Sequence, residues 1–369
     1  MAKKQLKVAI QKSINNYLFS AVIQCVIAAY DNLKPWFYEN YVQLYFVPNK
    51  RGRYVEKEKW IDFYGALTAP KEVLEYIDFK KDYFKDIDIM KFIESSLDDG
   101  YYFYTYYDEY YVKPSFMRTN NHFVHDLLIY GYDSESRKIT AIGYDDNKVF
   151  CFYEIDYDAF DIAFKSALEL TKGGGWEDMC FYALKIKCRY DENYKYDFDI
   201  SKFMSKFHDY IYSVNTGKKD YPYDIPCDYK DLHYLYTLKD NVYGMEINDH
   251  VLEYIKKNVE EKSPLHYVMF HTLYEHKVSI MERLQYIEEQ FHLKGMAEII
   301  NEYKQTVHSF DLIRHLALKY NKVKKDALLS DMISALEPGI NRERVLLTRA
   351  YEIISEHSST RRCQYETVY

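Results

Sequence analysis

Two strand-like segments joined by a polar turn constrain the fold of this chain more than any other feature of its sequence. The first segment begins at His125 and contains the apolar run 127–130, and the second segment, 139–145, ends at Asp145. The residues between them, 133–138, are polar, which is typical of the turn in a β-hairpin. Because a hairpin brings its two outer ends together, the sequence predicts that His125 and Asp145 are neighbours.

An imidazole beside a carboxylate is the orienting half of a Cys-His-Asp catalytic site. The carboxylate fixes the tautomer of the ring and stabilises the imidazolium that forms when the ring accepts a proton. A second histidine, His122, lies three positions before His125, so on a strand the two side chains point to opposite faces. We expect His125 to be the partner of Asp145, and His122 to face solvent or to cap the strand.

The spacing His-x5-Gly from His125 to Gly131, followed by Asp145 at the end of the next strand, resembles the second half of papain-like cysteine peptidases of the double-glycine leader type. It resembles still more closely the amino-terminal domain of the butirosin biosynthesis protein H group. The resemblance covers roughly residues 5–185 and implies a papain-like α+β fold. It also implies an activity, because the butirosin-type relatives transfer an acyl group from a carrier-protein thioester to an amine.

The resemblance assigns roles to two residues near the N-terminus. In the peptidase relatives, a helix begins with the catalytic Cys, and a Gln six residues earlier helps to form the oxyanion hole. Gln11 matches this Gln, and Tyr17 occupies the position of the nucleophile. A phenol with a pKa of about 10 is a poor nucleophile near neutral pH. We therefore expect a papain-like scaffold that lacks the usual Cys nucleophile and has no peptidase activity.

Cys25 is the alternative nucleophile, since it is the only Cys in the first 150 positions. If the helix begins near Asn16, which is a favourable N-cap residue, Cys25 lies more than two turns inside it. Its neighbours Val22, Ile23 and Val26 indicate a buried core. A thiol in that place lacks the helix N-terminus that would lower its pKa, and free Cys is commonly buried.

The charge balance and the tyrosine content bear on the partners of the chain. The 369 residues carry a formal net charge of −8 with a pI near 5.9, which argues against nucleic-acid binding as a main task. The chain contains 42 tyrosines, and Tyr supplies large amphipathic contact area that suits binding surfaces. The tyrosine-rich run 101–107 is a candidate for such a surface. Its alternative is a strand that is covered on both faces.

The cysteines and the hydropathy pattern predict no metal site and no membrane span. The Cys residues show neither C-x2-C spacing nor an accompanying His cluster, so we expect no zinc site and no cofactor. The start of the chain is an amphipathic stretch, which does not resemble a signal peptide. No window approaches 18 consecutive apolar residues. A bacterial cytoplasmic protein with reduced thiols is the simplest interpretation.

The hydrophobic periodicity divides the chain near residue 190. Up to that point, segments with helical spacing mix with segments that alternate, which predicts an α+β domain over residues 1–190. Residues 36–46 fit either a helix or a strand. The other predicted helices are 16–30, 71–77, 87–97 and 156–171, and the predicted strands are 101–112, 123–132, 138–144, 149–154 and 179–187. The glycine run 173–175 predicts the end of a helix, and its alternative, a phosphate-binding loop, lacks the required motif.

Residues 191–369 predict a mainly helical domain. A helix at 200–214 precedes a Pro-containing loop at 221–228, and almost everything beyond residue 247 has helical spacing. Ser263-Pro264 predicts the start of a long helix, because Ser caps and Pro suits the first turn. Three features predict breaks between further helices, namely Gly295, Tyr320-Asn321 and Pro338-Gly339.

The long helix carries an apolar stripe that includes His276, within the sequence Glu275-His276-Lys277. His271 lies five residues earlier and therefore on a different face of the helix. The HExxH arrangement of zinc peptidases is absent from the sequence. We interpret His276 as a hydrogen-bonded interior histidine, with a ligand or base as the alternative.

Three functions follow from these residues and from the resemblance. The first is an accessory or acyl/aminoacyl-transfer protein of a carrier-protein-dependent peptide natural-product pathway, such as antibiotic biosynthesis. His125 would deprotonate the acceptor amine, while Gln11 and a backbone N–H hold the oxyanion. The second is an inactive pseudo-peptidase that binds a peptide, a carrier protein or a partner chain. The third is a Cys-His-Asp acyltransferase that uses Cys25, His125 and Asp145. The expected partner is an acyl carrier protein or a peptidyl substrate, with a homodimer left open and neither nucleic acid nor membrane involved.

Overall fold

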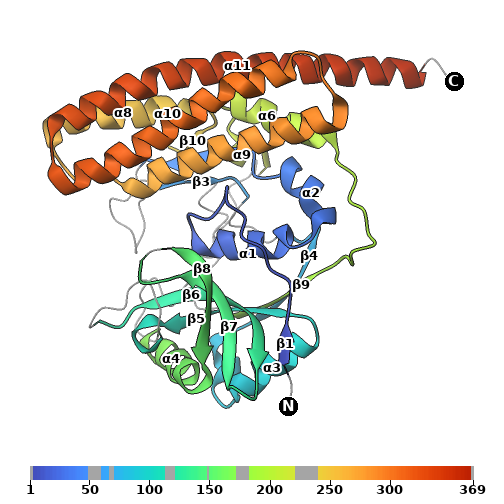
Figure 1. Ribbon diagram of the computed structural model, residues 1–369, viewed down its shortest axis with the longest axis vertical. Helices are drawn as coiled ribbons and strands as arrows, with labels where there is room; N and C mark the ends of the chain where they lie inside the picture. The colour runs from blue at the N-terminus through green and yellow to red at the C-terminus, as the bar shows by residue number, and fades with distance from the viewer. Residues whose placement is uncertain are drawn as a thin grey trace. The chain divides into compact units, whose positions relative to one another are not determined.

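The computed structural model describes residues 3–48, 60–65, 70–112, 121–147, 149–171, 183–220 and 240–366, with side chains up to residue 358 (Figure 1). These residues form two units. Unit 1 contains the described residues of Met1–Lys34 and Leu67–Lys195. Unit 2 contains those of Pro35–Ala66, Tyr196–Cys227 and Asp231–Tyr369. The predicted helix end at 173–175 and the predicted loop at 221–228 lie outside the described residues.

Unit 1 is built on an antiparallel 7-stranded sheet with the order β4-β9-β5-β6-β7-β8, in which β1 pairs with β6 beside this path. Every pair of neighbouring strands is antiparallel. The strands are β1 (Lys3–Gln5), β4 (Leu74–Phe79), β5 (Tyr102–Asp108), β6 (Val124–Asp133), β7 (Lys138–Tyr144), β8 (Phe150–Asp156) and β9 (Ala183–Cys188).

The predicted hairpin is confirmed as β6 and β7. Ile129 pairs with Ala141 and Leu128 with Ile142, and a β-bulge follows at residue 130. Asp133 stabilises the turn, because its Oδ1 accepts hydrogen bonds from the backbone N–H groups of Glu135 (3.0 Å) and Ser136 (3.1 Å). This use of an Asp side chain to close a turn is a common reason for Asp in such positions.

Helices lie on both faces of this sheet (Figure 1). The helices of unit 1 are α1 (Leu18–Ala28), α3 (Ile89–Asp98) and α4 (Tyr157–Leu170), with short 3-10 turns η1 (Asp31–Leu33), η2 (Lys81–Phe84) and η3 (Glu109–Tyr111). Phe103 of β5 packs on the α3 and α4 side, where its ring lies 5.5 Å from Phe92 and 6.2 Å from Phe84. Phe84 in turn lies 5.3 Å from Phe164 of α4. This aromatic cluster fills the core between the sheet and these helices.

Strand β5 shows why the tyrosine-rich run needs no binding role. Every residue from Tyr102 to Asp108 is buried, so this strand is covered on both faces, as the alternative interpretation of the run predicted. A different prediction was wrong. The sequence pattern predicts a helix over residues 71–77, but Leu74–Phe79 form β4, which pairs with β9. Pairing with a neighbouring strand outweighs a weak local helix preference.

Unit 2 combines a small antiparallel sheet with a helical bundle. The 3-stranded sheet has the order β10-β2-β3, with β2 (Leu44–Val47), β3 (Trp60–Phe63) and β10 (Val242–Tyr243). The predicted 36–46 segment resolves into helix α2 (Lys34–Glu39) followed by β2. The remaining helices are α6 (Ile200–Ile211), α7 (Thr216–Asp220), α8 (Glu246–Glu261), α9 (Tyr267–Phe291), α10 (Met296–Val323) and α11 (Asp326–Glu366).

Arg283 explains why residues 35–66, which we assigned to the first domain from the sequence, belong to unit 2. Its guanidinium group, on α9, is fully buried and donates to the backbone carbonyls of Phe37 (3.1 Å) and Asn40. The group also lies 4.8 Å from the centre of the Phe37 ring. These contacts attach the end of α2 to the bundle, since carbonyls at a helix C-terminus lack partners within the helix.

The bundle encloses a fully buried ion pair between Lys277 of α9 and Glu343 of α11, with Nζ and Oε2 3.0 Å apart. The remaining hydrogen-bonding capacity of Glu343 is used by Tyr210 of α6 and Tyr303 of α10, each at 3.0 Å, and by Asn248 of α8 at 3.0 Å. Lys277 also donates to the Tyr210 hydroxyl (2.8 Å). This charge pair is therefore satisfied by groups from every long helix of unit 2.

The predicted helix breaks are corrected in three places. Helix α9 begins at Tyr267, three residues after Pro264. Helix α10 continues through Tyr320-Asn321 to Val323, and Pro338 lies inside α11. Gly339 follows Pro338, and a Cβ at that position would meet the Cβ of Ser309 at 3.2 Å. The Pro-Gly pair thus marks a close approach of α11 to α10, and not a loop. Among the described helices, none has the length and apolar character needed to cross a membrane.

Removing one partner of the Lys277–Glu343 pair should destabilise the protein more than removing both charges. Lys277→Met leaves a buried carboxylate without its cation, and we expect the free energy of unfolding to fall by about 3–5 kcal/mol. The double variant Lys277→Met with Glu343→Gln has no buried charge and keeps an acceptor for the tyrosine hydroxyls, so it should recover part of this loss. Urea unfolding followed by circular dichroism measures each value.

Lys256→Met is the matched control for this comparison. Lys256 forms ion pairs with Glu253 (3.2 Å) and Glu337 (3.1 Å) on the surface of unit 2. An ion pair at the surface contributes little to the free energy of unfolding. Its replacement should leave the unfolding midpoint nearly unchanged. A double variant that is less stable than Lys277→Met alone would contradict the expected coupling between the two charges.

Candidate functional site

Two histidine–carboxylate pairs lie at one end of the sheet of unit 1. Strand β5 ends at Asp108 and continues into Glu109, while β6 begins at Val124 beside it, because Asp108 pairs with Val124 and Tyr107 with His125. The antiparallel arrangement therefore places the acids that end one strand next to the histidines that begin the other.

His125 is oriented by Glu109. Its Nδ1 lies 2.7 Å from Oε1 of Glu109, whose side chain is 1 % exposed, while the side chain of His125 is 20 % exposed. Its Nε2 lies 3.6 Å from Oδ1 of Asp126. Burial alone would lower the pKa of His125, but the hydrogen bond that the ring donates to Glu109 and the charges of Asp126 and Glu109 outweigh this effect and raise the pKa. The protonated ring is thus stabilised by two carboxylates.

Asp126 is the next residue of β6 and is buried. Its Oδ2 accepts a hydrogen bond from the Tyr104 hydroxyl at 2.7 Å, and this hydroxyl lies 3.5 Å from that of Tyr106. Burial raises the pKa of Asp126, and the charge of His125 and the bond from Tyr104 oppose this effect. The carboxylate is therefore held in one orientation near the start of β6.

His122 forms the second pair, with Asp108. Nδ1 of His122 lies 2.6 Å from Oδ2 of Asp108, which is fully buried. Asp108 also accepts hydrogen bonds from Ser166 Oγ (2.7 Å) and from the backbone N–H groups of Tyr110 and Phe123, each at 3.1 Å. The His122 side chain is 45 % exposed. This half-exposed position agrees with our expectation that His122 faces solvent.

Asp145 has a different role from the one that the sequence suggested. It follows β7 at the outer end of the hairpin, and its Oδ1 accepts hydrogen bonds from the backbone N–H groups of Asn147 (2.9 Å) and Val149 (2.8 Å). Asp145 thus closes the turn between β7 and β8, while Glu109 is the carboxylate bound to Nδ1 of His125. The adjacent acids at the end of the predicted strand 101–112 were the signal for this partner, because that strand runs antiparallel to 123–132.

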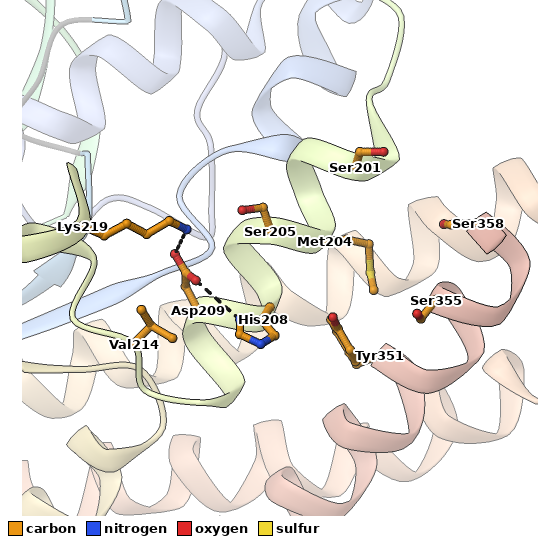
Figure 2. A pocket seen from close by; sticks show the side chains of 10 residues that line it. All are labelled: Ser201, Met204, Ser205, His208, Asp209, Val214, Lys219, Tyr351, Ser355 and Ser358. Carbon is orange, nitrogen blue, oxygen red and sulfur yellow. Dashed lines mark hydrogen bonds and ion pairs between the residues drawn. The ribbon is translucent and has the colours of Figure 1, made fainter. Parts of the chain in front are cut away.

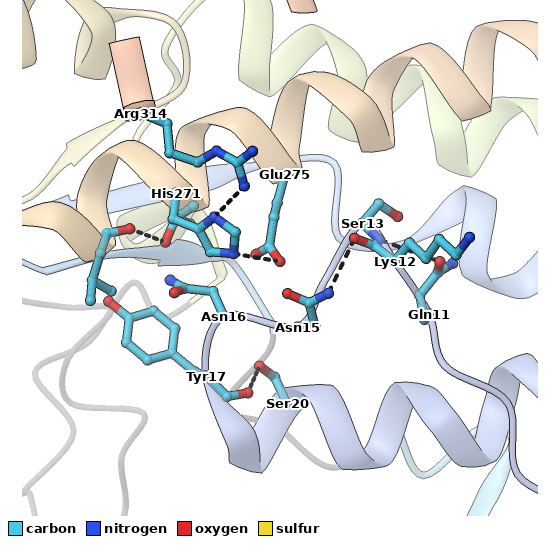
Figure 3. A network of polar contacts seen from close by, with 12 residues as sticks. Gln11, Lys12, Ser13, Asn15, Asn16, Tyr17, Ser20, His271, Glu275 and Arg314 are labelled. Atoms are coloured by element: carbon cyan, nitrogen blue, oxygen red, sulfur yellow. Dashed lines mark hydrogen bonds and ion pairs between the residues drawn. The ribbon is translucent and has the colours of Figure 1, made fainter. Parts of the chain in front are cut away.

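Tyr17 is the N-cap residue of α1, so it lies at the start of this helix. Its carbonyl accepts hydrogen bonds from the backbone N–H groups of Ser20 (3.1 Å) and Ala21 (2.9 Å) and from Ser20 Oγ (2.9 Å), as Figure 3 shows for the last. The Tyr144 hydroxyl, at the end of β7, donates to the carbonyls of Asn15 and Asn16. The start of α1 is therefore attached to the end of the hairpin.

Cys25 is buried inside α1, which confirms the expectation from its apolar neighbours. Burial raises the pKa of its thiol to about 12, although the backbone N–H of Gln11 opposes this effect. The backbone N–H of Ala9 donates to the Cys25 carbonyl (3.0 Å). The side chain of Gln11 lies near the backbone N–H of Ser13, with Oε1 3.5 Å from it (Figure 3). The segment around Gln11 thus covers Cys25, and a thiolate is disfavoured there.

Helix α9 of unit 2 carries a polar group around His271 and, five residues later, the buried His276. Nδ1 of His271 lies 3.1 Å from Arg314 Nη1, and its Nε2 lies 3.5 Å from Glu275 (Figure 3). Burial and the charge of Arg314 lower the pKa of His271 to about 4. His276 is fully buried, and its Nε2 lies 2.8 Å from the carbonyl oxygen of Val42. His276 is therefore an interior histidine with a backbone partner, as predicted.

The described residues contain no group of three or more His, Cys, Asp or Glu side chains that could hold a metal ion. No protein-family model matches the sequence, and no curated protein matches it either. The chemistry of the site therefore has to be inferred from its residues. Within unit 1, these residues offer an imidazole oriented by a carboxylate and a helix N-terminus attached to the same hairpin.

Alkylation should distinguish a buried Cys25 from a reactive one. Because the pKa of its thiol is raised to about 12, iodoacetamide should leave Cys25 unmodified in the native protein and label it after unfolding in urea. Mass spectrometry of the peptide that contains Cys25 measures the labelled fraction. Cys25→Ser should fold with some loss of stability, because it places a hydroxyl in an apolar site. Rapid native labelling with parallel loss of activity would make Cys25 the nucleophile.

The His125–Glu109 pair should make stability depend on pH in a defined direction. The pKa of His125 is raised above its unfolded value of about 6.5. Its contribution to stability is thus fully present below that value, and it is lost as the pH rises through the native pKa. Glu109→Gln removes the main cause of the increase, so it should cost more stability at about pH 5.5 than at about pH 9.

Thermal unfolding of the wild type and of Glu109→Gln across this pH range tests the expectation. Glu154→Gln is the matched control, because Glu154 pairs with Lys138 on the surface (2.8 Å). Its effect should be small at each pH. A cost of Glu109→Gln that grows as the pH rises would show that Glu109 does not stabilise the protonated His125.

Proposed function

We propose that this protein transfers an acyl or aminoacyl group from a carrier-protein thioester to an amine, without a covalent acyl-enzyme, in a peptide natural-product pathway. Unit 1 would be a papain-like domain, which is supported by helix α1, because it precedes the strands β4 to β9 of the antiparallel sheet and contacts the hairpin strands β6 and β7. The observation that carries the proposal is the pair of His125 and Glu109, with 2.7 Å between Nδ1 and the buried carboxylate.

In this reaction the nitrogen of the amine attacks the carbonyl carbon of the thioester, and the C–S bond breaks. His125 takes the proton of the attacking amine and passes it to the departing thiolate, so the imidazole ends each cycle as it began. Glu109 keeps the ring in one tautomer and stabilises the imidazolium between these two steps. An amine is itself the nucleophile, so the reaction needs no thiol from the protein.

The raised pKa of His125 suits the second step better than the first. A protonated imidazole is the correct form for protonating the leaving thiolate, whereas a base must be neutral when the amine attacks. The rate should therefore rise as the pH increases through the native pKa of His125. In this proposal, the side chain of Gln11 and a backbone N–H donate hydrogen bonds to the oxyanion that forms when the amine attacks.

A second candidate is a pseudo-peptidase that binds a peptide or a carrier protein without reacting with it. This alternative is favoured by Tyr17 at the start of α1 and by the buried thiol of Cys25. It is also favoured by Asp126, which lies 3.6 Å from Nε2 of His125 and stabilises the protonated ring. A ring that stays protonated is a poor base.

An assay with aminoacyl-loaded carrier proteins and simple primary amines separates the two candidates. For transfer, His125→Asn should lower the rate by about 10²–10⁴-fold, while Cys25→Ser should retain it. Mass spectrometry of the carrier protein and of the amide product measures turnover. His122→Asn is the matched control, since it changes the neighbouring histidine of the same strand end.

The pH profile gives the second criterion. Glu109→Gln should shift the rising limb of the rate to lower pH, because it lowers the pKa of His125, and it should also lower the maximal rate. Binding of carrier protein without amide formation in the wild type would favour the pseudo-peptidase. Equal rates for the wild type and His125→Asn would exclude His125 as the base.

A further inference from the structure

A hollow of about 570 Å³ opens on the surface of unit 2 between α6 and α11 (Figure 2). Helix α6 contributes Ser201, Met204, Ser205 and His208, which follow helical spacing and share one face. This volume is within the range of small-molecule sites in proteins, about 300–1,000 Å³. The residues that line the hollow all belong to unit 2, whereas His125 and Glu109 belong to unit 1.

The wall on α11 is formed by Tyr351, Ser355 and Ser358, which also share one face of their helix. Small hydroxyl side chains thus stand on both helices where larger apolar side chains would close the space between them. Figure 2 shows the Met204 side chain and the Tyr351 ring between these hydroxyl groups. The hollow therefore has an apolar centre and a polar rim.

One end of the hollow is formed by an ion pair. Oδ2 of Asp209 lies 2.8 Å from Nζ of Lys219, and its Oδ1 lies 3.5 Å from Nδ1 of His208 (Figure 2). The Asp209 side chain is 6 % exposed, whereas those of Lys219 and His208 are 48 % and 45 % exposed. The carboxylate is thus directed into the protein and holds two cationic or hydrogen-donating groups at the surface of the hollow.

We propose that this hollow binds a small molecule with an oxyanionic end group, either a phosphate or a carboxylate. Lys219 and His208 offer N–H donors, and Ser201, Ser205 and Tyr351 offer hydroxyl groups along the walls. Among the described residues that line the hollow, Asp209 is the only carboxylate, and its side chain is far less exposed than those of Lys219 and His208. Donor groups around a partly enclosed space bind an oxyanion through charge-assisted hydrogen bonds.

The ligand body would lie along the serine-lined walls and contact Met204 and Tyr351. The hydroxyl groups of Ser201 and Ser205 can donate or accept a hydrogen bond. The Ser358 hydroxyl donates to the carbonyl of Ile354 (2.9 Å) and can still accept one. A hydroxyl- or amide-bearing chain with an anionic end fits these groups better than an apolar molecule. This assignment is independent of the acyl-transfer proposal, because it uses no residue of unit 1.

The test uses inorganic phosphate as the probe and the methyl group of Met204 as the reporter. The full chain is labelled with ¹³C at the methionine methyl groups, and Met204→Leu identifies the signal. Phosphate is added at constant pH and ionic strength. We expect a saturable shift of the Met204 signal with a dissociation constant on the order of 1 mM. Acetate titrated in the same way separates a carboxylate site from a phosphate site.

Lys219→Gln should weaken phosphate binding about tenfold or more. Lys202→Gln is the matched control, because it removes a Lys of α6 that does not line the hollow, and it should bind as the wild type does. The double variant Ser205→Ala with Ser355→Ala keeps every charge, and it should also weaken binding. It tests the site even if Lys219→Gln, which leaves Asp209 without its cation, fails to fold.

Two results would overturn the proposal. One is a Met204 shift that stays linear with phosphate and acetate, or that is the same in Lys219→Gln and in the wild type. The other is a saturable shift with glucose and none with either anion, which would make the hollow a site for neutral polyols.

Discussion

The ion pair between Lys277 and Glu343 is the interaction on which the arrangement of unit 2 depends. Two charges without exposure to water are destabilising unless their remaining hydrogen-bonding groups find partners. Here Tyr210, Tyr303 and Asn248 supply those partners, and each comes from a different helix. A shift of any one helix along its axis would leave a buried charge or hydroxyl without its partner. The pair therefore selects one packing of the bundle among the many that its apolar stripes allow.

Unit 1 uses buried polar groups in a different way. Its core is held by apolar and aromatic side chains, and its carboxylates gather where strands end. Asp108 uses its oxygens on two backbone N–H groups, a serine and His122, so it fixes the start of β6 relative to the end of β5. Glu109, one residue later, is left to orient His125. The same strand end thus contains one carboxylate that stabilises the fold and one that orients a titratable ring.

Most elements of the fold could be predicted from the sequence, because their signals are local. The hairpin, the buried position of Cys25 and the interior position of His276 follow from periodicity and from neighbouring apolar residues. The failures have tertiary causes. Strand β4 has helix-forming residues and is extended because β9 lies beside it, and Pro338-Gly339 continues a helix because Gly339 allows α10 to approach. In the site, the hairpin pattern indicates which ends of β6 and β7 meet. It does not indicate which carboxylate binds Nδ1 of His125, because that depends on the pairing of β5 with β6 and on the use of Asp145 in the β7–β8 turn.

The two carboxylates around His125 also limit what chemistry this end of the sheet can perform. A single carboxylate at Nδ1 orients the ring and leaves Nε2 to exchange protons. A second carboxylate, that of Asp126, lies near Nε2. When it is ionised, it stabilises a proton on Nε2, and a general base must release this proton in each cycle. Asp126 is itself buried and accepts a hydrogen bond from Tyr104. Burial raises the pKa of Asp126, and in its neutral form Asp126 would not stabilise a proton on His125. If His125 is the base that we propose, a neutral Asp126 would favour release of the proton from the ring, and an ionised Asp126 would retain it there.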